Sequence, residues 1–139
     1  MATTETWRSR SRIVLAVFYA AAGILHIALP TPFLSITPAW VPDAPNVILL
    51  TGVCEIAGAI GLLVPAVRRC AGIMLALYAI CVFPANIKHA LDDLGGMVVS
   101  TWQWLYHVPR LALQPFIVWL VLFAGGLLSW PFRRSDPEP

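Results

Sequence analysis

The sequence predicts an all-α fold, namely an integral membrane four-helix bundle with both termini on the cytoplasmic side (N-in/C-in) and two structured outer loops. Hydrophobic residues make up 59% of the 139 residues and charged residues only 12%, about half the charged share of an ordinary soluble domain. The apolar residues gather in four long runs, and the basic residues gather at the ends of those runs. A soluble fold with so few charges could not cover its surface.

Four apolar segments are long enough to cross a bilayer, at about residues 13–29, 46–64, 70–91 and 109–130. A helix needs about 20 residues to cross a hydrocarbon core of about 30 Å, because each residue rises about 1.5 Å. Pro65 marks a helix end, whereas Pro109 suits the first turn of a helix. Residues 1–139 are therefore expected to form a single transmembrane domain, with residues 1–11 and 133–139 as cytoplasmic tails.

The basic residues predict the orientation. They form three clusters: Arg8, Arg10 and Arg12; Arg68 and Arg69; Arg133 and Arg134. Cytoplasmic loops are enriched in Lys and Arg, so the two remaining loops, which contain Asp43, Asp92 and Asp93, are expected to face outward. Both of these loops are apolar enough to lie in the interface or to fold back over the bundle. We expect a multi-pass protein of the bacterial inner membrane.

Three other interpretations of these features were weighed. A cleavable signal peptide is the alternative for the first segment, which has an Arg-rich start and a run of small residues. Nucleic-acid binding is not expected, because the basic clusters flank apolar runs instead of covering a face. Cys54, Cys70 and Cys81 form no C-x-x-C motif, which favours buried small side chains over a thiol relay.

Polar and ionisable residues occur in every predicted span. The candidate ligand-binding residues are His26, Glu55, Asn86, His89, His107, Arg110 and Gln114. Charged groups in a bilayer cost about 2.5–3.5 kcal/mol on insertion scales and usually face the bundle interior. Counted from the predicted outer ends, these groups come to the outer leaflet. We expect one shared pocket with Glu55 and Arg110 as a buried pair, widened by kinks at Pro84 and Pro115.

Structural roles are the alternative for each of these residues. Glu55 can be a protonated hydrogen-bonding group between helices, Arg110 can extend to the outer head groups, and Asn86 and Gln114 can join helices. The histidines can be ordinary interfacial residues. A metal site is not expected, because H-x-x-x-H spacing is missing and Arg110 would repel a cation. Haem is not expected either, since no haem motif occurs.

Four stretches carry a resemblance to a known family. They are Gly23 to His26 with the proline-rich segment after it, Gly52 to Glu55, Val82 to Asn86, and Arg110 to Gln114. Over about residues 16–122 the chain resembles the DoxX-like family of small bacterial membrane proteins, although Ala112 stands where proline is expected. The resemblance implies a four-helix membrane bundle. The family takes its name from a subunit of a thiosulfate:quinone oxidoreductase and other members are linked to oxidative-stress complexes, so the implied role is redox-associated but not fixed.

Three functions remain open at this point. The first is a redox-associated subunit that binds a quinone or a similar apolar ligand in the outer-leaflet pocket and works with redox partner proteins. The second is a small membrane enzyme in which Glu55 performs acid–base chemistry. The third is a scaffold or anchor for soluble partners, in which the polar residues only fix helix packing. No cofactor is certain, and a quinone is the one that the residues suit.

Overall fold

The computed structural model describes residues 3–132, and within that range the chain folds into five helices and no strands. The helices are α1 (Thr4–Ala28), α2 (Pro30–Ile36), α3 (Ala44–Leu63), α4 (Arg68–Leu94) and α5 (Thr101–Ala124). Four of them, all except α2, are long and apolar enough to cross a membrane. The prediction of an all-α fold with four such helices is confirmed. The predicted tail at 133–139, with Arg133 and Arg134, lies outside the described residues.

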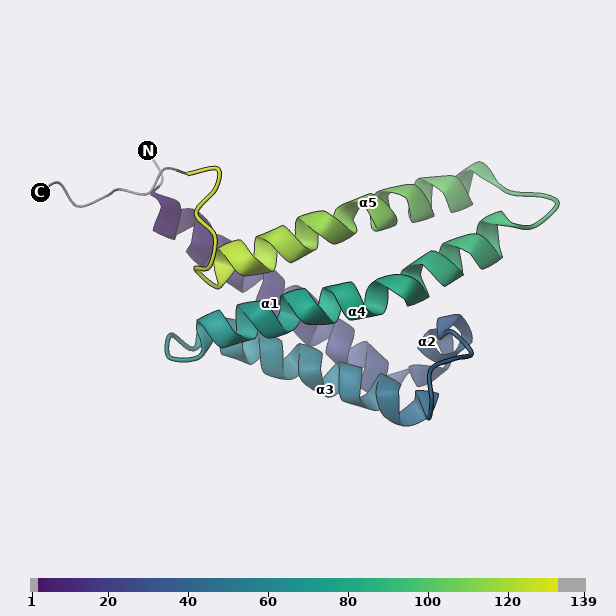
Figure 1. Ribbon diagram of the computed structural model, residues 1–139, viewed down its shortest axis with the longest axis horizontal. Coiled ribbons are helices and arrows are strands. Elements are labelled where there is room, and N and C mark those ends of the chain that lie inside the picture. The colour runs from purple at the N-terminus through teal and green to yellow at the C-terminus, as the bar shows by residue number, and fades with distance from the viewer. Residues whose placement is uncertain (1–2, 133–139) are drawn as a thin grey trace, which may run out of the picture.

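The long helices associate as two pairs (Figure 1). Helices α1 and α3 pack against each other, α4 and α5 form an antiparallel hairpin, and α4 packs on α3. The short helix α2 lies at the end where α1 finishes and α3 begins. At the opposite end, the side chain of Arg12 in α1 donates from Nε to the carbonyl of Ala124 in α5 at 2.8 Å. The beginning of α1 and the end of α5 therefore lie together.

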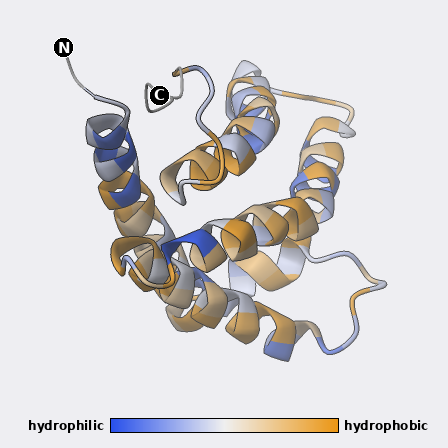
Figure 2. Ribbon diagram, turned by 60° about the vertical axis from the view of Figure 1, so that its left-hand side comes forward, coloured by the Kyte–Doolittle hydropathy of each residue, from blue (hydrophilic) through white to orange (hydrophobic). Residues whose placement is uncertain are grey.

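The outer faces of the long helices are apolar. Figure 2 shows hydrophobic residues over most of the bundle and hydrophilic residues gathered in the first turns of α1. Exposed side chains on the four long helices include Val14, Val17, Leu50, Ile60, Leu77, Ile80, Leu113 and Phe116. A contiguous apolar surface of this kind is a liability in water and is the surface that lipid requires. The exposure pattern thus agrees with a membrane-embedded bundle.

Small residues let the helices approach closely. A Cβ atom on Gly23 of α1 would lie 2.6 Å from the carbonyl oxygen of Gly52 in α3, and one on Gly52 would lie 2.9 Å from that of Gly23. Gly58 of α3 similarly accommodates the side chain of Leu75 from α4. Close backbone approach at small residues is the usual means of packing helices in membranes. Gly52 therefore lets two helix backbones approach, whereas Gly58 makes room for a side chain.

Two helices begin well before the predicted spans. Helix α1 starts at Thr4, and the side chain of Thr3 accepts a hydrogen bond from the amide of Thr6. Helix α5 starts at Thr101, because Ser100 and Gln103 form a capping box that satisfies free amide groups of the first turn. Pro109 consequently lies inside α5 and not in its first turn. The interhelical loop is correspondingly shorter than the sequence predicted.

Helix α5 ends at Ala124, before the predicted boundary at residue 130. Gly125 is the C-cap residue, and Gly126 follows with a φ of 80°. That left-handed backbone costs glycine little and most other residues more, so a Gly-Gly pair is a common helix terminator.

The expectation that the cysteines are buried is wrong for two of them. Cys70 and Cys81 are exposed and Cys54 is half-buried, all as free thiols. Cys70 and Cys81 both belong to α4, whose outward face is apolar, so these thiols face the surroundings of the bundle and not its core.

The contact between α1 and α3 provides a test of the fold. Replacing Gly52→Ala places a methyl group against the Gly23 backbone, and such overpacking typically costs about 1–3 kcal/mol. We expect a lower thermal unfolding midpoint in detergent. Gly96→Ala is the control, because the nearest atom to its new Cβ is 4.0 Å away. Equal midpoints for the two variants would contradict a tight α1–α3 crossing.

Candidate functional site

The first polar cluster, called the Glu55 cluster, consists of His26 of α1, Glu55 of α3 and Tyr78 of α4. His26 comes three residues after Gly23, and Glu55 comes three residues after Gly52. Both side chains therefore lie at the α1–α3 crossing, where these two glycines are in contact. His26 Nδ1 lies 2.9 Å from Glu55 Oε2, and the Tyr78 hydroxyl donates to Glu55 Oε1 at 2.8 Å. Glu55 is only 3% exposed, so this carboxyl belongs to the interior.

One oxygen of the buried carboxyl lacks a directed hydrogen bond. His26 Nδ1 also lies 2.9 Å from the carbonyl oxygen of Ala22. A carbonyl only accepts, so Nδ1 carries the proton, and its N–H bonds to Ala22. Glu55 Oε2 is near the imidazole but has no hydrogen-bond partner among residues 3–132. A buried acceptor with unused capacity is rare in proteins.

Helix α2 covers this cluster from the side of the bundle end. The ring of Phe33 stacks on the imidazole of His26, with centroids 3.7 Å apart and planes inclined by 24°. No residue of α2 is fully buried, but Phe33 is half-buried and the helix contacts α1, α3 and α4. Phe33 is therefore the aromatic side chain that α2 contributes to this cluster.

The second cluster, called the Arg110 cluster, joins α4 and α5. It consists of Asn86, His89 and Asp93 of α4 with His107, Arg110 and Gln114 of α5. Arg110 Nη1 lies 2.8 Å from His89 Nδ1, and Nη2 donates to Asn86 Oδ1 at 2.6 Å. The guanidinium group therefore binds two neutral side chains of the facing helix.

Amide groups extend the Arg110 cluster toward the middle of the hairpin. Asn86 Nδ2 donates to Gln114 Oε1 at 3.1 Å, and Gln114 Nε2 donates to the backbone carbonyl of Ala79. Pro84 lies inside α4 near this point, where a proline disturbs the hydrogen bonds of the preceding turn. Gln114 thus joins α5 to the α4 backbone one residue before the carbonyl that Pro84 leaves without its helical donor, which is a structural role.

At the other end of the Arg110 cluster, two imidazoles converge on one carboxylate. Asp93 Oδ2 lies 2.9 Å from His107 Nε2 and 3.4 Å from His89 Nε2. His107 is 1% exposed, and its Nδ1 has no hydrogen-bond partner among the described residues. Asp93 stands four residues after His89 on the same helix face.

The predicted buried pair of Glu55 and Arg110 is wrong. Neither side chain forms an ion pair with the other; Glu55 contacts His26 and Tyr78, and Arg110 contacts His89 and Asn86. Tyr78 and Asn86 are eight residues apart on α4, which corresponds to about 12 Å along the helix axis. The clusters therefore differ in depth, and the expectation of one shared pocket is replaced by two separate sites.

His89, Asp93 and His107 bring three potential metal ligands within 4.8 Å of one another. The sequence did not indicate this group of three residues, because His107 comes from the neighbouring helix. The hydrogen bonds do not fit a metal, however. Arg110 can only donate, so His89 Nδ1 must hold the lone pair and Nε2 the proton. The Nε2 atom that faces Asp93 then has no electron pair for a cation, and the adjacent guanidinium repels one.

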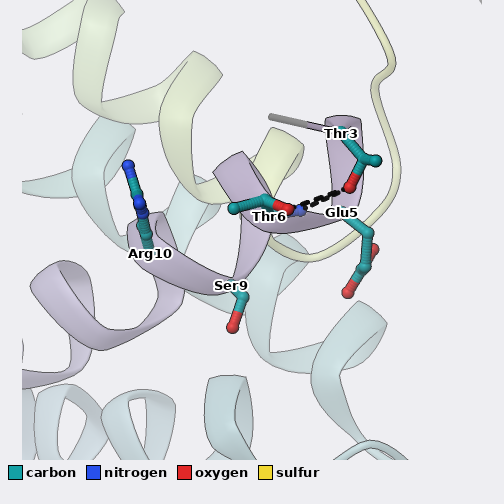
Figure 3. Close-up of a pocket in the computed structure, with 5 residues that line it drawn as sticks. All are labelled: Thr3, Glu5, Thr6, Ser9 and Arg10. Atoms are coloured by element: carbon teal, nitrogen blue, oxygen red, sulfur yellow. Dashed lines mark hydrogen bonds between the residues drawn. The ribbon is translucent and has the colours of Figure 1, made fainter. Parts of the chain in front are cut away.

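Surface depressions lie away from the Glu55 cluster. One, shown in Figure 3, is formed by Thr3, Glu5, Thr6, Ser9 and Arg10 in the first turns of α1. Its open shape and its position at the far end of α1 from His26 separate it from both polar clusters. Another lies between Pro38–Trp40 and the C-terminal half of α4, and is lined by Pro84, Ile87, Lys88, Leu91 and Asp92.

Sequence reasoning missed three participants in these clusters. Tyr78 lies in an apolar run of α4, so nothing in the sequence indicated a polar role. Its hydroxyl nevertheless reaches the depth of Glu55 and bonds to it. Phe33 was assigned to a loop. Asp93 was assigned to an outward-facing loop, and the His89–Asp93 spacing of four residues was the signal that placed it on the helix.

Fold and site together define a small all-helical protein with four helices suited to crossing a membrane and with polar groups joining those helices. The chain belongs to the family described as a domain of unknown function, DUF8561, whose model matches residues 15–124. No curated protein and no solved structure matches the chain. The resemblance to DoxX-like proteins stays a prediction.

Zinc provides a test of the histidine tautomer. A ligand at one hundred times its dissociation constant stabilises the native state by about 2.7 kcal/mol, so tight zinc binding would raise the unfolding midpoint. We expect no rise for the natural protein. Arg110→Leu removes the donor that fixes His89, and this variant should gain zinc-dependent stability. A zinc-dependent rise in the natural protein that His107→Asn abolishes would show that the triad binds metal.

Proposed function

We propose that this is a multi-pass protein of the bacterial cell membrane, with both termini cytoplasmic, whose Glu55 cluster binds the reduced head group of a lipid-soluble quinone. The observation that carries the proposal is the Glu55 carboxyl, which is buried in a membrane-spanning helix with Oε2 unpartnered among residues 3–132. A buried acceptor without a donor is costly, by about 1–3 kcal/mol. A ligand hydroxyl would remove that cost.

The reduced form of the ligand fits better than the oxidised form. With a proton on Nδ1, His26 in its neutral form would present Nε2 as an acceptor, close to the Glu55 carboxyl group whose Oε2 lies 2.9 Å from Nδ1. Two acceptors suit the hydroxyl groups of a quinol, whereas the carbonyl groups of a quinone require donors. Arg110, Asn86 and Gln114 already bond to one another, so they are not assigned to the head group.

The stacked ring of Phe33 supports the same proposal. It occupies the face of His26 at a centroid distance of 3.7 Å, which is the position that a flat aromatic head group would take. Because Phe33 is only half-buried, its side chain could move aside without leaving a fully buried position. A quinol that enters from the lipid would replace Phe33 on His26 and donate a hydroxyl to Glu55.

A redox-associated role follows from this binding mode. Oxidation of a quinol to a quinone releases two protons and two electrons. Glu55 and His26 are positioned to accept protons, and an electron-carrying partner protein would accept the electrons. The expected likeness to DoxX-like proteins agrees with such a role. The residues would then bind and deprotonate the quinol without holding a redox centre of their own.

The orientation is supported by charge at the two ends of the bundle. Arg8, Arg10, Arg12 and Arg68 lie at the end where α1 begins and α5 finishes, and Asp92 and Asp93 lie at the other end. Basic residues favour the cytoplasmic side. In a variant without natural cysteines, Met97→Cys should react with an impermeant maleimide in intact cells, whereas Ser9→Cys should react only after permeabilisation. The reverse labelling pattern would overturn the N-in/C-in assignment.

Binding of a short-chain benzoquinol in mild detergent tests the ligand assignment. Titration calorimetry under reducing conditions should give weaker binding for Glu55→Gln by at least about tenfold, equivalent to about 1.4 kcal/mol, because the amide offers a donor where the quinol needs an acceptor. The oxidised benzoquinone should bind the natural protein more weakly than the quinol. Lys88→Gln, which alters only an exposed ion pair with Asp92, is the control.

The Arg110 cluster gives this experiment its second arm. Arg110→Gln should retain quinol affinity if the Glu55 cluster is the binding site. Unchanged affinity in Glu55→Gln with a loss in Arg110→Gln would move the site to the α4–α5 seam. Equal quinol affinity in all variants, with lowered thermal stability for Glu55→Gln, would show that the polar groups serve only helix packing. That outcome would favour a scaffold function.

A further inference from the structure

At the end of the bundle where α1 begins, Arg8, Arg12 and Arg68 carry more positive charge than the nearby acidic groups of the described chain balance. Arg8 and Arg12 of α1 reach the end of α5, where Arg12 Nε donates to the Ala124 carbonyl and Arg8 Nη2 donates to the Leu128 carbonyl, each at 2.8 Å. Arg68 begins α4, and its backbone carbonyl would lie 3.2 Å from a Cβ atom on Gly125. Two helices, α1 and α4, thus bring arginines to the end of α5.

The local negative charge does not balance these arginines. Glu5 is the acidic partner, with Oε1 at 2.6 Å from Arg12 Nη1, and Arg8 and Arg68 lie within Coulombic range of the same carboxylate. The end of α5 adds the equivalent of about half a negative charge. Within residues 3–132, the three guanidinium groups therefore exceed the negative charge around them by more than one unit.

Two of the guanidinium groups also have unused donors. The Nε atoms of Arg8 and Arg68 are buried, and neither has a hydrogen-bond partner within residues 3–132. Helix capping explains the bond that Arg12 makes to the Ala124 carbonyl, and Arg8 bonds to a carbonyl of the segment after α5. Neither bond uses the Nε–H groups of Arg8 and Arg68. Excess charge together with free N–H donors is the chemistry that recognises a phosphate group.

The membrane supplies such a group at this level. Trp7 and Trp130 lie at the same end and are 45% and 73% exposed, and tryptophan is enriched where the hydrocarbon core meets the head groups. We propose that Arg8, Arg12 and Arg68 form a binding site for the phosphate of an anionic phospholipid between α1, α4 and the end of α5. Basic pockets between membrane helices are known to bind such head groups.

Native mass spectrometry of the detergent-purified protein tests this site with phosphatidylglycerol, phosphatidylcholine and inorganic phosphate in separate titrations. Phosphatidylglycerol should bind with one tight equivalent, and the other two should not. The double variant Arg8→Gln/Arg68→Gln should weaken that equivalent at least tenfold. The double variant Arg10→Gln/Arg69→Gln has the same net charge but alters exposed arginines, and it should retain the lipid.

A milder substitution separates geometry from charge. Arg68→Lys keeps the positive charge and removes the Nε–H donor, so it should lower phosphatidylglycerol affinity while the helical content stays unchanged. Equal losses in the two double variants would show that the lipid responds only to net charge, and the site would be rejected. Inorganic phosphate that binds as tightly and displaces the lipid would likewise overturn the assignment to a phospholipid.

Discussion

The contact between Gly23 and Gly52 is the constraint on which the rest of the site depends. Without side chains at these positions the α1 and α3 backbones approach until each carbonyl would meet a Cβ atom of the other helix at less than 3.0 Å. His26 and Glu55, one turn further along each helix, are thereby brought to 2.9 Å. The hydrogen bond from Tyr78 then adds α4 to the pair. A steric property of two glycines thus determines which ionisable groups meet.

The bundle also separates its charges along its length. At one end, Arg12 binds the last carbonyl of α5, where cations are favoured by the helix dipole. At the other end, Arg110 is held by His89 and Asn86, and Asp93 lies close to His89 and His107. Helix α4 has 27 residues, or about 40 Å, which exceeds a hydrocarbon core of about 30 Å. The residues beyond that core can therefore be polar without the full cost of burial in lipid.

Much of the fold could be predicted from the sequence because hydropathy depends on local runs of residues. The four helices long and apolar enough to cross a membrane follow from such runs. The helix ends were harder. Ser100 and Gln103 carry a capping box that extends α5 by two turns before Pro109, and Gly125 with Gly126 ends it early. These signals were present in the sequence, but the proline dominated the interpretation of that boundary.

The pairing of polar groups could not be predicted in the same way. Depth along a helix can be counted, whereas the direction in which a side chain points depends on how the helix is rotated against its neighbours. On α4, Tyr78 bonds to α3 and Asn86 bonds to α5, so two polar groups of one helix joined different clusters. Opposite charge alone predicted an ion pair between Glu55 and Arg110. In the structure, Glu55 instead contacts His26 and Tyr78. Because those partners leave one carboxyl oxygen unsatisfied, the same packing that excluded the predicted pair created the acceptor on which the proposed ligand site rests.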